Sequence, residues 1–438
     1  MVLIATFINV LLLYAGINAL VTKITRGDGK ALTMLTSAVI LFITLGFLYY
    51  LMLLLSLGFS VLLMLLTIIN LAYIYFTKDF LKNYRLKLLS NDHICALAAG
   101  FFLTCYFLLY ASKHGSWDAW AIWNLHAKFL YFTASWRNMF SKELAYSHLD
   151  YPLMLPSVVA FFWNGIGKTT PFVPLLLSYG LLLAVPLYIY FSLRDAGLKW
   201  LPYAALAMFV ADNNFKDLAV SQCADTLLAL LILMVFVQYS KLKNGSDNRA
   251  LLLGFVCAAS AWVKNEGLMF YILFTLCFII ANYKQVPVLK KYFAGLVLPT
   301  LVLVSFKLFF APANDLVSHE NKNLSSILVV LTDAGRYLTI LKSWLNTLIS
   351  NYMYMLILIF AAFIFNRKFF RSLPAVVMAV LLLAYFVIYL ITPHDLKWHL
   401  STSVSRIFLH VYPAIVYLIL SSLEATDISR TLAHNLKN

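Results

Sequence analysis

The chain has 438 residues, of which 63% are hydrophobic and only 12% are charged, and its mean hydropathy is +0.85. A soluble domain carries about a quarter charged residues, so this composition excludes an ordinary soluble enzyme. Apolar runs of about 18 residues or more recur along the chain, and each could cross about 30 Å of hydrocarbon. The alternating ten-residue segments of a spanning β-barrel are absent from the sequence. We therefore predict an all-α polytopic membrane protein.

The net charge of +15 arises from 33 Lys and Arg against 18 Asp and Glu. Most of the basic residues fall in short loops between apolar runs, where they set the orientation of the chain in a membrane and meet anionic lipid. We therefore do not expect nucleic acid as a partner. All five cysteines lie in or beside apolar runs, which predicts buried free thiols rather than disulfides: Cys95, Cys105, Cys223, Cys257 and Cys277.

The basic loops predict the topology. Residues 1–21 lack the positive region that precedes a cleavable signal, so they are expected to form a retained first span with the N-terminus outside. The segments predicted to be cytoplasmic are 22–30, 78–87, 194–199, 241–249, 284–291 and 367–371. The segments predicted to be external are 112–152, 212–222, 264–267, 312–346 and 392–405. This alternation requires about thirteen spans.

Two segments do not fit simple spans. Residues 153–167 form a short apolar stretch that contains Pro156 and Gly165, and the alternation of sides predicts that it is re-entrant or lies at the external face, buried against protein. The second segment is a helix with one apolar stripe, expected to lie in the outer membrane interface. Its stripe consists of Ile327, Leu331, Ala334, Leu338, Leu341 and Leu345.

Polar and ionisable groups in or beside a membrane are costly, so they are candidates for function. Asp118 follows an apolar run, lies between Trp117 and Trp120, and precedes a predicted helix over residues 119–131. A base that deprotonates a hydroxyl needs such a position, and the indole rings provide a surface on which a sugar stacks. The alternatives are that Asp118 only caps the helix and that the tryptophans only anchor the chain at the interface.

A second polar group ends the same external segment. His148 and Asp150 stand just before Tyr151 and Pro152, which suggests a contact with substrate. A divalent metal is the open alternative for this pair, although no third ligand stands nearby.

Two further sets of charged residues suggest an anion site. Lys264 and Glu266 meet where two apolar runs join, and they form either a phosphate contact or a pair that neutralises itself. Lys397, His399 and Arg406 stand at the external end of the last spans, where basic groups bind a lipid-linked phosphate or simply extend to the interface.

The order of these motifs resembles the GT-C superfamily of membrane glycosyltransferases, in particular the branch with protein O-mannosyltransferases and lipid A aminoarabinose transferases. SWDAWAIW places Asp118 where this superfamily has its catalytic carboxylate, in the first large external loop. HLDYPLMLP is similar to the motif that ends that loop, although here His148 precedes Asp150. QCADTLLALL, WVKNEGL and SRIFLHVYP resemble later segments and add Asp225, Lys264, Glu266 and Arg406.

The resemblance covers roughly residues 94–413 and implies a GT-C-like module over 94–423. Its external loops would be 112–170, 212–223, 311–346 and 392–406, residues 1–93 would be additional N-terminal spans, and 424–438 would be a cytoplasmic tail. The resemblance also implies a polyprenyl-phosphate-sugar donor and an inverting single displacement. In that reaction Asp118 is the base, while Lys264, Arg406, Lys397 and His399 bind the lipid phosphate. Trp117, Trp120, Lys128, His148, Asp150, Asp225 and Glu266 would contact substrate.

Other functions fit part of the pattern. A transporter or flippase of a lipid-linked or anionic substrate would show internal repeats, which we do not find. A polymerase or ligase of surface polysaccharide would use the same donor and suits the long segment 312–346. The acceptor could be a glycan, a lipid or a protein. The basic loops suit a bacterial inner membrane with the site facing the periplasm, and an endoplasmic-reticulum membrane would give almost the same pattern.

Overall fold

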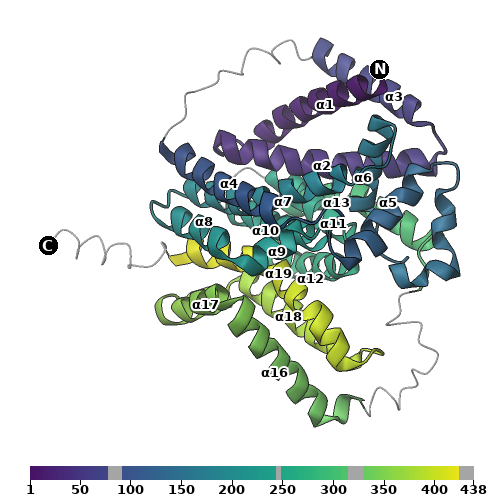
Figure 1. Ribbon diagram of the computed structural model, residues 1–438. Helices are drawn as coiled ribbons and strands as arrows, with labels where there is room; N and C mark the ends of the chain where they lie inside the picture. Colours follow the sequence, from purple (N-terminus) through teal and green to yellow (C-terminus); the bar gives the residue numbers. More distant parts are fainter. Residues whose placement is uncertain (77–90, 243–247, 314–329, 424–438) are drawn as a thin grey trace.

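The computed structural model describes residues 1–76, 91–242, 248–313 and 330–423 (Figure 1). Within these ranges the chain is helical and contains no strand, which confirms the all-α prediction. The first helices are α1 (Val2–Ile24), α2 (Lys30–Leu54), α3 (Phe59–Phe76) and α4 (Asn91–Tyr110). A π-helix, η1 (Ala119–Trp123), then leads into α5 (Asn124–Tyr131), the 3₁₀ helices η2 (Trp136–Phe140) and η3 (Lys142–Ser147), and α6 (Met154–Ile166).

The remaining helices follow in two groups. The first group is α7 (Phe172–Asp195), α8 (Leu201–Ala211), α9 (Asn213–Val220), α10 (Asp225–Leu242), α11 (Arg249–Ala261), α12 (Asn265–Asn282) and α13 (Val286–Phe309). The second group is α16 (Ala334–Asn351), α17 (Met353–Phe365), the 3₁₀ helix η4 (Arg367–Arg371), α18 (Leu373–Ile391) and α19 (Leu396–Leu423).

Nine of the described helices are long and apolar enough to cross a membrane, as expected of a multi-pass membrane protein. They are α1, α2, α4, α7, α10, α12, α13, α18 and α19. The pair α16 and α17, bent by 98° at its junction, would make a tenth. The predicted number of thirteen is not confirmed, because the other predicted spans fall on the shorter apolar helices α3, α8 and α11. The 11 residues of α8 extend only roughly 17 Å, about half of the hydrocarbon thickness.

The centre of the fold is the pair formed by α10 and α19, which pack against each other. Almost every residue of α10 is buried, as is the second half of α19 from Ile407 to Leu420. A helix that is apolar on all sides is surrounded by lipid or by other helices, and the burial of α10 shows that other helices surround it. In Figure 1, α1 and α2 lie along one edge of the bundle, α16, α17 and α18 lie along the other, and α10 and α19 lie between them.

Two glycines allow α11 and α13 to approach closely. A Cβ atom on Gly254 would overlap the carbonyl of Tyr292, and a Cβ atom on Gly295 would overlap the carbonyl of Leu251. Small residues at a crossing bring helix backbones together, which is how helices in membranes gain packing energy. This crossing holds α11 in place, and the C-terminal end of α11 leads directly to Lys264.

The helix α6 corresponds to the short apolar segment 153–167. It has 13 residues, most of them buried, and it packs against α2 and α5. An α-helix of this length extends roughly 20 Å and cannot cross about 30 Å of hydrocarbon alone. Because α2 packs against both α6 and α7, the N-terminal helices pack into the same core as the rest of the bundle.

The predicted amphipathic helix is present as α16. Tyr337 and Trp344 pack against Phe386 of α18, with ring centroids 6.0 and 5.6 Å away. The side chains of the predicted stripe at 338, 341 and 345 are exposed. The stripe therefore faces away from the protein, while the opposite face contacts α18. Residue 327 of the predicted stripe lies outside the described residues.

At one end of the bundle, acidic and basic groups join three loops that were predicted to be cytoplasmic. Asp28 accepts hydrogen bonds from Arg249 and Lys241, each at 3.0 Å. Asp195 accepts from the same Lys241 at 2.9 Å and from the backbone N–H of Gly29 at 2.8 Å. These side chains come from the segments 22–30, 194–199 and 241–249, which the alternation of sides placed together.

At the other end, the contacts join segments that were predicted to be external. Asp225 binds Lys264, and Ser405 donates to Asn214 at 2.9 Å. Gln222 donates to the carbonyl of Ser112 at 2.9 Å. The last two contacts each join two segments predicted on the same side, and Asp225 lies three residues after such a segment, so the fold agrees with the predicted alternation. Which end faces the cell exterior stays a prediction.

The five cysteines are free thiols. Cys223 and Cys257 are buried, and Cys105 and Cys277 are partly buried, as expected. The expectation is wrong for Cys95, which is exposed on α4 because that face of the helix has no neighbour.

We expect Gly254→Ala to lower the thermal midpoint of the purified protein, because the added methyl group forces α11 away from α13. Gly180→Ala is the matched control, since a Cβ atom there meets nothing within 4 Å in the middle of α7. Alanine is favoured over glycine inside a helix by about 0.5–1 kcal/mol, so this control should retain or gain stability. Equal midpoints for the two variants would show that the α11–α13 crossing tolerates separation.

Candidate functional site

Two ion pairs form one charge cluster at the end of the bundle that was predicted to be external. The first joins Asp118, just before η1, to Arg406 of α19. The second joins Asp225, the first residue of α10, to Lys264 before α12 at 2.8 Å. Arg406 also interacts electrostatically with Asp225, so the two pairs belong to one site. Residues 118 and 406 are far apart in the sequence, and only the fold brings them together.

The structure contradicts the simpler reading of Asp118 as a helix cap. Its side chain makes no capping hydrogen bond to η1, and its carboxylate binds the Arg406 guanidinium instead. The backbone before it is fixed, because the N–H of Ser116 donates to the carbonyl of Ser221 at 3.0 Å. Gly115 has φ of 72°, and a Cβ atom there would contact Ser221 and Ala119, so a larger residue would displace this loop. The helix begins with a π-turn, a distortion that is frequent at functional sites.

Asp225 is held by two basic side chains. Its Oδ1 accepts hydrogen bonds from Lys264 Nζ at 2.8 Å and from His410 Nε2 at 2.9 Å. The side chains of Asp225 and Lys264 are only 2% and 4% exposed. A buried carboxylate with two such donors at the N-terminus of a helix is held as the anion.

Two carboxylate oxygens in the cluster have no hydrogen-bond partner within the described residues. They are Asp225 Oδ2 and Glu266 Oε2, and both atoms are buried. Glu266 also binds Lys264, with its Oε1 3.2 Å from the ammonium. A buried acceptor without a donor is costly. These oxygens are therefore suited to accept hydrogen bonds from the hydroxyl groups of a ligand or from water.

Lys264 carries a positive charge at neutral pH. Burial lowers the pKa of Lys264, but the carboxylates of Asp225 and Glu266 raise it more, so its pKa lies above the ordinary value. The ammonium lies 5.6 Å from the centroid of the Tyr151 ring. Burial raises the pKa of the Tyr151 phenol, which therefore stays neutral.

The segment around His148 and Asp150 supports this cluster. The Tyr151 ring stacks on Trp123 at 5.6 Å and on His148 at 4.9 Å. Asp150 accepts a hydrogen bond from Asn265, the residue after Lys264, at 2.6 Å. His148 and Asp150 thus contact an aromatic ring and an amide. The described residues contain no group of three or more His, Cys, Asp or Glu that could hold a metal ion.

The remaining predicted site residues lie outside the two ion pairs. Trp117 and Trp120 are exposed beside Asp118, with ring centroids 5.8 Å apart. His399 is half-buried, accepts or donates a hydrogen bond with Thr392 at 2.9 Å, and lies near enough to Glu266 and Arg406 to interact electrostatically. Lys128 and Lys397 are exposed and take no part in the ion pairs.

Two further basic residues, the buried His410 and the partly buried Lys307, were not singled out from the sequence. His410 lies one helical turn after Arg406, so both project from the same face of α19. Lys307 of α13 donates to the carbonyl of Asp150 at 2.6 Å and to Asn265 at 2.7 Å. Both interrupt apolar runs, and an ionisable residue inside an apolar run was the signal that could have identified them.

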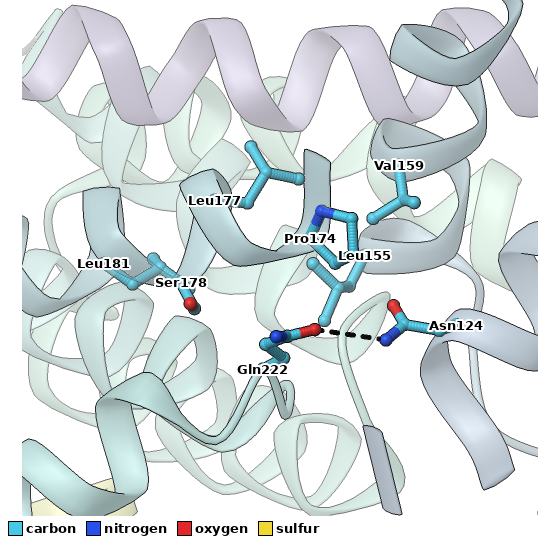
Figure 2. Close-up of a pocket in the computed structure, with 8 residues that line it drawn as sticks. All are labelled: Asn124, Leu155, Val159, Pro174, Leu177, Ser178, Leu181 and Gln222. Atoms are coloured by element: carbon cyan, nitrogen blue, oxygen red, sulfur yellow. Dashed lines mark hydrogen bonds between the residues drawn. The ribbon is translucent and has the colours of Figure 1, made fainter. Parts of the chain in front are cut away.

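A small cavity lies between α5, α6, α7 and the turn before α10 (Figure 2). Its volume is about 10 Å³, room for about one water molecule. The side chains of Asn124 and Gln222 meet at its edge through a hydrogen bond of 3.2 Å. The other lining residues are mainly apolar: Leu155, Val159, Pro174, Leu177, Ser178 and Leu181. This cavity is too small for a sugar, and we assign it no substrate.

The chain was compared with protein-family models, curated proteins and solved structures, and none of them matches.

His410 provides a test of the buried network. Its Nε2 must carry the hydrogen that Asp225 accepts, and a leucine there would leave that carboxylate with one donor. We expect His410→Leu to cost about 1–3 kcal/mol of stability, measured as a lower thermal midpoint. His410→Gln keeps an N–H donor of similar reach and should lose less. If both variants lose the same stability, the hydrogen bond to Asp225 is not what His410 contributes.

The burial of His126 leads to a prediction of how the stability of the protein depends on pH. It is fully buried in α5, its Nε2 lies 3.2 Å from Ser147 Oγ, and burial lowers its pKa to about 3. The unfolded chain binds a proton at this site below about pH 6.5, whereas the folded chain does not. Stability should therefore be complete above pH 6.5 and decrease as the pH falls from there toward 3.

The measurement is the thermal midpoint as a function of pH for the wild type and for His126→Phe, with the exposed His114→Gln as the control. The phenylalanine variant should lose less stability over this pH range than the wild type or the control. Parallel curves for all three proteins would mean that His126 is not the group responsible.

Proposed function

We propose that this chain is an integral-membrane glycosyltransferase that moves a sugar from a polyprenyl-phosphate-linked donor to a hydroxyl acceptor. The observation that supports this most directly is the cluster itself. Asp118, a partly exposed carboxylate, pairs with Arg406 at one end of a bundle of long apolar helices. Arg406 also interacts electrostatically with Asp225, which pairs with the second cation of the cluster, Lys264. A base next to an anion site at the membrane surface is the arrangement that this transfer requires.

The reaction would be an inverting single displacement. The hydroxyl oxygen of the acceptor attacks the anomeric carbon of the donor sugar, and the bond between that carbon and the phosphate oxygen breaks. Asp118 takes the proton of the acceptor hydroxyl. Arg406 and Lys264 stabilise the charge that develops on the leaving phosphate. Trp117 and Trp120 offer an exposed aromatic surface to the sugar.

Other residues would bind the substrates less directly. The unpaired oxygens of Asp225 and Glu266 accept hydrogen bonds from sugar hydroxyls. His148 and Asp150 support the site through Tyr151 and Asn265. His399 adds a polar group near the phosphate, whereas Lys128 and Lys397 are exposed and would meet substrate only at the edge of the site.

The proposed function also implies a fold and a location in the cell. The fold would be GT-C-like, with its site at the periplasmic face of a bacterial inner membrane. Support for this comes from the side-chain contacts, which join the predicted external segments at the end of the bundle that carries the cluster. Partners would be the lipid-linked donor, membrane lipids, and a glycan, lipid or protein acceptor.

Binding of polyprenyl phosphate tests the anion site. A ligand that binds only the folded state raises the thermal midpoint. We expect polyprenyl phosphate to raise the midpoint of the wild type, and Arg406→Ala to remove this increase. Lys168→Ala is the matched control, because it removes one exposed positive charge from a segment predicted on the same side. No increase for the wild type would contradict the proposed donor.

Transfer itself tests the base. Asp118→Asn should lower the rate of sugar transfer from polyprenyl-phosphate sugars to water or to added acceptors by about 10²–10⁴-fold, because the amide cannot take a proton. Lipid binding should survive this change. Full activity in Asp118→Asn would reject Asp118 as the base, and lipid binding without any transfer by the wild type would favour a carrier instead.

A further inference from the structure

Building on the proposed function, we propose that Asp118 and the phosphate of the donor compete for Arg406, so that binding of the donor releases the catalytic base. The Asp118 carboxylate occupies a position on the guanidinium that a phosphate oxygen would also take. The ion pair then keeps the site inactive until the donor arrives.

The contacts of Arg406 leave room for this exchange. Its Nε donates to the carbonyl of Thr402 at 3.1 Å, within the same helix, and its Nη1 donates to Asp118 Oδ2. Its other terminal nitrogen, Nη2, makes no hydrogen bond to the described residues. A guanidinium can bind two oxygens of one phosphate through parallel N–H groups. A phosphate could therefore use both terminal nitrogens, whereas Asp118 uses one.

The two ion pairs of the cluster differ in how firmly they are held. Asp225 and Lys264 are 2% and 4% exposed, and His410 and Glu266 hold them further. Asp118 and Arg406 are 24% and 25% exposed, and Arg406 is the one described hydrogen-bond donor to Asp118. Ion pairs that water reaches contribute little net free energy. The Asp118–Arg406 pair is therefore the one that an incoming anion can open, while the buried pair stays in place.

The exchange links two steps of the reaction. While Arg406 holds Oδ2 of Asp118, the carboxylate faces the guanidinium and not an acceptor hydroxyl. Once the phosphate holds Arg406, Asp118 is free to take the proton of the acceptor hydroxyl. After transfer, Asp118 passes this proton to water and pairs with Arg406 again, which helps to expel the polyprenyl phosphate. The donor must then bind before the acceptor can react.

This competition reverses the usual effect of a substitution in a binding site. Asp118→Asn removes the competing carboxylate, so it should strengthen binding of polyprenyl phosphate by about five-fold. The dissociation constant is measured by titration of detergent-solubilised protein with polyprenyl phosphate. Asp395→Asn is the matched control, because it also removes one exposed negative charge and asparagine still caps the start of α19. Its affinity should stay within about two-fold of the wild type.

The double variant Asp118→Asn/Arg406→Ala decides whether the effect passes through Arg406. The gain from Asp118→Asn should disappear when Arg406 is absent. A gain that persists in the double variant, or an unchanged affinity in Asp118→Asn alone, would overturn the competition while leaving the proposed function intact. Binding that is insensitive to Arg406→Ala would overturn both, because the anion site would then lie elsewhere.

Discussion

The candidate site depends on one buried interaction, the contact of Asp225 with Lys264 and His410. It joins the start of α10, the residue before α12 and the middle of α19, and all three side chains are almost fully buried. Charges in such a place are stable only together, because each alone would lose the hydration that it has in water. The most buried helix pair of the molecule is therefore fixed at one point by charge. That point lies next to the partly exposed pair of Asp118 and Arg406.

The helix α19 connects the two pairs. Arg406 and His410 are one turn apart, so the same helix face holds a partly exposed arginine and a fully buried histidine. The first binds Asp118 and the second binds Asp225. A displacement of α19 would disturb both pairs at once. The arrangement separates a rigid part of the cluster, which orients Lys264, from an exchangeable part, which is open to solvent.

Charge is also concentrated at the opposite end of the bundle. There Asp28 and Arg249 are paired and nearly inaccessible to water, and they join loops that are distant in the sequence. The two ends differ in their chemistry. At the Asp28 end, both carboxylate oxygens have donors, which is typical of a structural role. At the Asp225 end, two buried carboxylate oxygens have no hydrogen-bond partner in the part of the chain that the structure describes, which is typical of a place prepared for a ligand.

Much of the site could be anticipated residue by residue, because an ionisable group is expensive in an apolar chain and stands out for that reason. Asp118, Asp225, Lys264, Glu266 and Arg406 were selected in this way, and the structure brings them together. Lys128 and Lys397 were selected on the same grounds, yet both are exposed. The same rule applies to His410 and Lys307, but the apolar residues around each of them are typical of an ordinary span, and the sequence alone did not identify them as part of the site. The rule identifies charges but does not determine their partners.

The sequence by itself determined the helical architecture and the two groups of loops. Both follow from local properties, namely the length of each apolar run and the charge between the runs. The helix lengths and all of the pairings were decided only by the tertiary structure. The length of α8, which ends after 11 residues, depends on which distant segments pack beside it. In the same way, Asp118 binds Arg406 and does not cap a helix because the fold brings Arg406 to it. The packing of α10, α19 and their neighbours decides which side chains meet, and packing is a property of the whole chain.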